Sequence, residues 1–167
     1  YHKKEKNMKK EALKIMDIYE LKERQMMLDN KFKEKMKIKK LSPKSIKIAY
    51  LDELGELIHE LKPLWCYWKK DNKPVNKRRV LEELSDCLHF ALSYENNKGH
   101  EAEIIFTVFT NEPQRLEKSI KKLTKIKNIF SSIYHILIAL NYTIEEFLEV
   151  HHQVWLRNMN IRTGDDY

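Results

Sequence analysis

The chain contains two near copies of one eight-residue pattern, at residues 52–59 and 82–89. Each copy consists of an acid, Glu, Leu, a small residue, an acid, two apolar residues and His. Side chains three positions apart are neighbours on an α-helix, so the second and fifth residues of each copy form a pair of carboxylates. The repeat therefore predicts two similar helices that each carry such a pair of carboxylates and that pack against each other.

The apolar residues around each copy predict which face of the helix is buried. On the first helix they form one stripe centred on Leu54, and on the second helix a stripe centred on Leu84. The predicted core residues are Tyr50, Leu54, Leu57, Ile58 and Leu61, then Val80, Leu81, Leu84, Cys87, Leu88 and Ala91. The acids flank these stripes. The small residues Gly55 and Ser85 are expected to let the two helices approach closely.

Four carboxylates facing one another repel unless a cation lies between them. Hard divalent cations such as Mg²⁺ prefer oxygen ligands. We therefore expect Glu53, Glu56, Glu83 and Asp86 to bind Mg²⁺. The alternative interpretation is a solvated acidic surface, which is the usual setting of a single acidic pair on a helix.

Composition favours one all-α domain. Only three glycines and four prolines occur in 167 residues, and Lys, Glu, Leu and Ile are abundant. This composition is typical of a helical protein, and the length suits one domain with a real core. We expect an antiparallel helical bundle over residues 1–167. The expected helices lie at about 9–37, 43–61, 77–96, 113–140 and 143–159, with residues 104–110 as an irregular insertion or a short helix.

Charge and targeting signals exclude several other classes. No apolar run is long enough to span a membrane, and no signal-peptide pattern opens the chain, so we expect a cytoplasmic protein. The net charge is +7, but the lysines are spread along amphipathic helices and no nucleic-acid-binding motif occurs. Stable nucleic-acid binding is not expected. Cys66 and Cys87 form no metal motif, and Cys87 falls on a core stripe.

Carboxylates around Mg²⁺ suit hydrolysis of a phosphoanhydride. No glycine-rich phosphate loop is present, so phosphates would be held by the cation and by side chains. The C-terminal segment offers two guanidinium groups and two amides near a terminal Tyr; its alternative interpretation is a solvated chain end. Trp65 and Trp68 either stack on a base or pack in a core. His59 and His89 are expected to be structural or surface residues.

Three motifs together resemble a known family. They are Leu51-x-Glu53-Leu54-Gly55-Glu56-Leu57, the aromatic Trp65-Cys66-Tyr67-Trp68-Lys69, and Leu81-Glu82-Glu83-x-x-Asp86-x-Leu88-His89-Phe90-x-Leu92-Ser93. They resemble the all-α dimeric dUTPases, which belong with the MazG-like nucleotide pyrophosphatases. The resemblance begins near Gln25 and extends to the C-terminal segment.

The resemblance implies a Mg²⁺-dependent dUTP diphosphatase that converts dUTP to dUMP and pyrophosphate and also accepts dUDP. It implies that the four acids bind the metal and that Glu56 activates water, with Glu53 as the second catalytic acid. Gln25 and Trp68 would lie near the uracil and the sugar. The phosphate-side residues would be Lys69, Arg157, Asn158, Asn160 and Arg162, and Tyr167 would close over the site.

Two other functions stay open at this point. One is a MazG-like pyrophosphatase for another nucleoside triphosphate, and the other is a helical protein-interaction module. Many apolar faces in a short chain favour a homodimer. Residues 99–112 are an insertion within the single domain and a candidate surface for a protein partner.

Overall fold

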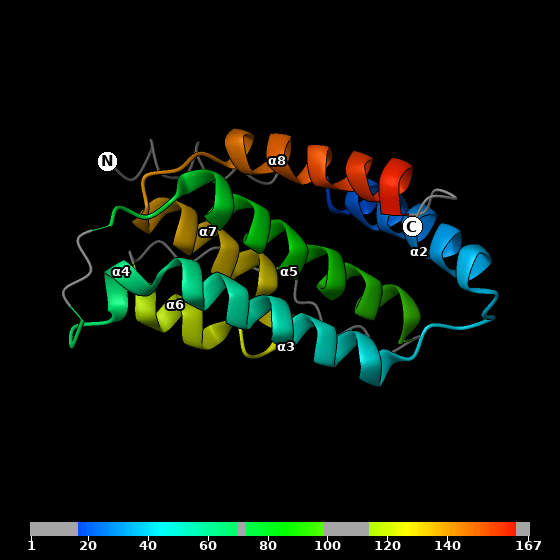
Figure 1. Ribbon diagram of the computed structural model, residues 1–167, viewed down its shortest axis with the longest axis horizontal. Helices are drawn as coiled ribbons and strands as arrows, with labels where there is room; N and C mark the ends of the chain where they lie inside the picture. Colours follow the sequence, from blue (N-terminus) through cyan, green and yellow to red (C-terminus); the bar gives the residue numbers. More distant parts are fainter. Residues whose placement is uncertain (1–16, 70–72, 99–113, 163–167) are drawn as a thin grey trace.

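The computed structural model describes residues 17–69, 73–98 and 114–162. Within these ranges the chain is helical and contains no strand, which confirms the all-α prediction (Figure 1). The elements are α2 (Ile18–Met36), α3 (Pro43–Glu60), α4 (Lys62–Trp65), α5 (Lys77–Asn97), α6 (Leu116–Lys122), η1 (Ile126–Asn128), α7 (Ile129–Ala139), α8 (Ile144–Arg157) and η2 (Asn158–Arg162). None of these helices is long and apolar enough to cross a bilayer.

Helix α5 lies at the centre of the bundle. It packs most extensively against α3 and also contacts α8, α2 and α7. Figure 1 shows α3 and α5 running antiparallel, joined through α4, with α8 and α2 on the other side of α5. Because α5 has neighbours on several sides, it buries polar residues such as Glu83, Ser85 and His89 besides its apolar stripe. This position brings the second acidic motif into the interior of the fold.

The predicted core of the two acidic helices is confirmed. On α3, Tyr50, Leu54, Leu57 and Leu61 are buried, while Ile58 is half-buried at the edge. All six predicted α5 residues are buried. The Tyr50 hydroxyl donates to the carbonyl of Leu123, 2.5 Å away, which ties this core to the segment after α6.

The predicted helix starts are confirmed as well. The Ser42 side chain accepts a hydrogen bond from the backbone of Ser45, with Pro43 as the first helical residue. Asn76 caps α5 in the same way. Thr143 and Glu146 form a reciprocal capping box at the start of α8. These side chains satisfy backbone N–H groups that a helix leaves without internal partners.

The structure differs from the single helix predicted over 113–140. Helix α6 ends at Lys122, a short turn and η1 follow, and α7 begins at Ile129. Two side chains bond to backbone carbonyls here: Thr124 Oγ1 donates to Lys121 and Asn128 Nδ2 to Lys122. Such local bonds compete with the helical ladder and explain the break.

Two smaller expectations are also corrected. The stretch between the helices expected at 43–61 and 77–96 is not all loop, because it contains α4, with Pro63 in the first turn, where proline is tolerated. Gly55 does not allow a close helix approach, since a Cβ at that position would meet nothing within 4 Å. Ser85 is fully buried but bonds to His151 of α8 instead of packing on Gly55.

The first predicted helix is confirmed only from Ile18 onward. It begins after the Asp17 cap and ends at Met36, where Lys37 adopts a left-handed conformation with φ 55°. Residues 9–16 lie outside the described residues, and so does the 99–112 segment with its proposed partner surface.

Candidate metal centre

Three of the four predicted acids come together between α3 and α5. Glu53 of α3 and Glu83 and Asp86 of α5 each place one carboxylate oxygen within 4.8 Å of the other two. Glu83 is buried, whereas Glu53 and Asp86 are half-buried. The repeat places these groups side by side because each acid stripe flanks the core seam that the two helices share.

The electrostatics of Glu83 show how crowded this cluster is. Burial first, and then the negative charges of Asp86, Glu53 and Glu56, raise the pKa of Glu83 from 4.5 to about 7. The positive charge of Arg79 opposes the shift. A buried carboxylate with acidic neighbours is stabilised in its charged form by a cation.

Glu56, the fourth predicted acid, lies at the margin of this group. Its side chain is exposed on α3, one turn after Glu53. It is close enough for its charge to contribute to the raised pKa of Glu83, but it is outside the tight set of three carboxylates.

The donor chemistry of the cluster fits a hard divalent cation. The three converging groups are all carboxylates, the ligands that Mg²⁺, Mn²⁺ and Ca²⁺ prefer. A softer donor is nearby in Cys87, which is fully buried. Burial first, and then the charges of Glu53, Asp86 and Glu83, raise the pKa of the Cys87 thiol well above its usual value. In the metal-free protein, the raised pKa keeps the Cys87 thiol protonated.

Arg79 is a neighbour of the cluster that the sequence reasoning missed. Its guanidinium Nη2 lies 2.9 Å from Oε1 of Glu83, four residues later on α5. The charge of Glu83 is the main cause of a raised pKa for Arg79. The i,i+4 spacing of Arg79 and Glu83 was the available sequence signal.

Gln25 lies in a buried polar network that includes His89 of α5. Its Oε1 accepts from His89 Nδ1 at 2.7 Å, and its Nε2 donates to Asp29 at 2.9 Å. His89 stacks on His151 with ring centroids 4.2 Å apart, and His151 bonds to the Ser85 hydroxyl. The network links α2, α5 and α8. The expectation that His89 is structural agrees with these contacts; His59 is exposed on α3.

Burial dominates the pKa values in this network. It raises the pKa of the Asp29 carboxyl, although hydrogen bonds from Gln25, Ser93 and Asn97 oppose the shift. It also lowers the pKa of His151 well below its usual value, which favours the neutral imidazole. The network therefore fixes both polar ends of the Gln25 amide by hydrogen bonds.

Two of the predicted phosphate residues lie at the end of α8. Arg157 is its last residue and is half-buried, and Asn158 begins η2 and is buried. Arg157 Nε and Asn158 Oδ1 are buried and have no hydrogen-bond partner within the described ranges. Buried polar atoms usually have a hydrogen-bond partner, so each of these two atoms is open to a further contact. Asn160 is exposed; Tyr167 and the Arg162 side chain are outside the described part of the chain.

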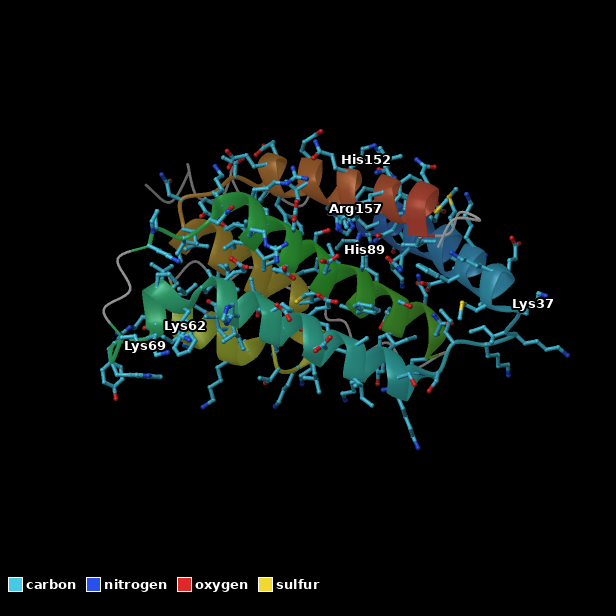
Figure 2. The ribbon with its side chains drawn as sticks, in the orientation of Figure 1. Lys37, Lys62, Lys69, His89, His152 and Arg157 are labelled. Atoms are coloured by element: carbon cyan, nitrogen blue, oxygen red, sulfur yellow. The ribbon has the colours of Figure 1, made fainter. Side chains whose placement is uncertain are left out.

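The aromatic loop lies elsewhere in the molecule. Trp68 is 62% exposed and makes edge contacts with the rings of Trp65 and Tyr67. Figure 2 shows Lys69 at the end of the molecule where α4 lies, well away from His89 and Arg157. Within one chain, the structure therefore does not bring Lys69 and Arg157 together.

One known family matches this chain. The family model described as dUTPase matches residues 17–162. The match runs from the cap of α2 to the last residue of η2 and so includes both acidic helices and the end of α8. No curated protein matches the chain.

Proposed function

Because this chain belongs to the all-α dimeric dUTPase family and is a dUTP diphosphatase, we propose that it hydrolyses dUTP to dUMP and pyrophosphate in a Mg²⁺-dependent reaction and also accepts dUDP. The observation that carries this proposal is the convergence of Glu53, Glu83 and Asp86 at the buried junction of α3 and α5.

In this proposal Glu53, Glu56, Glu83 and Asp86 hold the cation. When bound there, Mg²⁺ would neutralise phosphate charge and lower the pKa of a water molecule. The exposure of Glu56 supports a separate role for it. A carboxylate at the open margin of the site can reach solvent and accept a proton from the attacking water, with Glu53 beside it as the second catalytic acid.

We propose two groups of substrate contacts, one with the base and sugar and one with the phosphates. Gln25 is held rigidly by His89 and Asp29, which suits a residue beside the uracil and sugar, and Trp68 offers an exposed ring for stacking. The phosphates would contact Lys69, Arg157, Asn158, Asn160 and Arg162, and Tyr167 would close over them. The unpartnered polar atoms of Arg157 and Asn158 support this assignment.

We also propose that the protein is a homodimer. Large apolar side chains are exposed on several elements, among them Ile48 and Leu51 on α3 and Tyr67 after α4. Burying them against a second copy removes apolar surface from water. In a dimer, Lys69 of one copy and Arg157 of the other could both contact the same nucleotide.

The test is product release from a panel of nucleoside triphosphates and dUDP, with and without Mg²⁺. We expect dUMP and pyrophosphate from dUTP, dUMP from dUDP, and loss of both activities when the metal is chelated. Turnover of other nucleotides with dUTP left intact would contradict the substrate assignment. Full dUTP turnover in chelator would contradict the metal centre.

A further inference from the structure

The guanidinium of Arg79 lies among three carboxylates beside the candidate metal centre. Its Nη2 is 2.9 Å from Oε1 of Glu83, its Nε donates to Oε1 of Glu60 at 3.4 Å, and its Nη1 is 3.7 Å from Oε2 of Glu82. Glu83 belongs to the proposed ligand set, whereas Glu60 and Glu82 do not. The Arg79 side chain therefore links the proposed metal ligands to two acids, Glu60 and Glu82, that are not ligands.

The helix dipoles of α3 and α5 alone disfavour the positions of Arg79 and Glu60. Arg79 lies in the first turn of α5, where the helix dipole disfavours a positive charge. Glu60 is the last residue of α3, where the dipole disfavours a negative charge. Because α3 and α5 are antiparallel, these two ends meet, and the Arg79–Glu60 pair offsets both costs (Figure 1). The acids around Arg79 thus account for its charge at this position.

We propose that Arg79 is the internal counter-cation of the metal centre. It neutralises Glu83 in the metal-free protein and withdraws toward Glu60 and Glu82 when a divalent cation binds. The inference rests on the proposed metal centre. A guanidinium and a divalent cation on the same carboxylate repel each other strongly in a partly buried site.

The side chains have the freedom and the partners that this exchange requires. The Arg79 side chain is 49% exposed, so it has room to turn, whereas the Glu83 side chain is only 7% exposed. Glu60 and Glu82 remain available to Arg79 after it leaves Glu83. Arg79 is therefore a positioning residue that tunes metal affinity by competition, and it is not a group that contacts the reacting atoms.

Calorimetric titration of the metal-free full chain with Mg²⁺, without nucleotide, tests the proposal. The neutral variant Arg79→Gln is expected to bind Mg²⁺ about tenfold more tightly than the wild type, because one competing charge is gone. Arg79→Lys keeps the charge and is expected to stay within about threefold of the wild type. Arg78→Gln is the matched control: Arg78 lies in the same turn with the same exposure, and its contacts go to Glu82 and Gln153.

If Arg79→Gln binds Mg²⁺ as tightly as the wild type or more weakly, the proposed role of Arg79 is overturned. An equal gain in Mg²⁺ affinity in Arg78→Gln also overturns it, because the gain would then reflect net charge alone. A second measurement needs no variant. The NMR signal of the Arg79 Nε–H group in the wild-type protein is expected to shift during the Mg²⁺ titration, and an unmoved signal overturns the exchange. Absence of Mg²⁺ binding by the wild type contradicts the metal centre itself, which separates that failure from failure of this inference.

Discussion

At the scale of single residues, two opposing influences act on the ionisation of Glu83. The side chain is buried beside Asp86 and Glu53, which favours the protonated acid, while Arg79 favours the charged form. Metal binding requires the charged form. The raised pKa of Glu83 therefore connects proton binding, metal binding and stability at one carboxylate.

The first prediction concerns pH. Because the folded pKa of Glu83 is about 7 and the unfolded value is near 4.5, the folded state binds a proton more tightly than the unfolded state. The Glu83 contribution to stability is thus present below pH 4.5 and is lost as pH rises through 7. The free energy of unfolding of the metal-free protein, relative to Glu83→Gln, is expected to fall by roughly 2–4 kcal/mol across this range.

Denaturant unfolding at a series of pH values, with chelator present, measures this difference. Mg²⁺ affinity should rise about tenfold between pH 6 and pH 8 for the same reason, since a proton competes with the metal. A difference between wild type and Glu83→Gln that does not change with pH would show that Glu83 ionises normally.

The second prediction concerns Glu56. Since its side chain is exposed, Glu56→Gln is expected to leave the melting temperature almost unchanged. Loss of a general base should lower kcat for dUTP by about 10²–10⁴-fold. Asp52→Asn, at an exposed acid on the same helix, is the control and should keep its activity. Full activity in Glu56→Gln would remove it from the mechanism.

At the scale of elements, the repeated motif predicted that α3 and α5 pack against each other. Periodicity identified their buried residues, and Ser42, Asn76 and Thr143 cap the helices whose starts were expected at about 43, 77 and 143. These features depend on neighbours within one or two turns, so sequence is sufficient to predict them. The break between α6 and α7 was not predicted, because the apolar period continues through it while Thr124 bonds locally.

The third prediction follows from Gly55. It lies inside α3 with open space where a Cβ would be. Alanine costs less conformational entropy than glycine in a helix, so Gly55→Ala should raise the free energy of unfolding by about 0.5–1 kcal/mol. Denaturant unfolding at fixed protein concentration measures the change. A destabilised variant would mean that something approaches the α3 backbone in solution.

At the scale of the whole molecule, the central position of α5 explains both what sequence predicted and what it missed. The acids could be found from spacing alone. The Gln25–His89–His151 network and the Arg79–Glu60 pair join residues from different helices, and they depend on how α2, α3 and α8 pack around α5. Their partners are far apart in sequence, so no local pattern predicts them.

The fourth prediction is the assembly state. If the exposed apolar residues are covered by a second copy, sedimentation equilibrium at micromolar concentration should give twice the chain mass of 20.2 kDa. The dimer should persist at high salt, because burial of apolar surface is not screened by ions. A single species of one chain mass would contradict the homodimer.

The central claim is that a divalent cation lies between the acidic faces of α3 and α5. The most direct test is anomalous X-ray diffraction from a crystal grown with Mn²⁺ and a non-hydrolysable dUTP analogue. We predict an anomalous peak bounded by the carboxylates of Glu53, Glu83 and Asp86, with the analogue's phosphates beside it. A peak elsewhere, with these three carboxylates bound to no metal, would contradict the account.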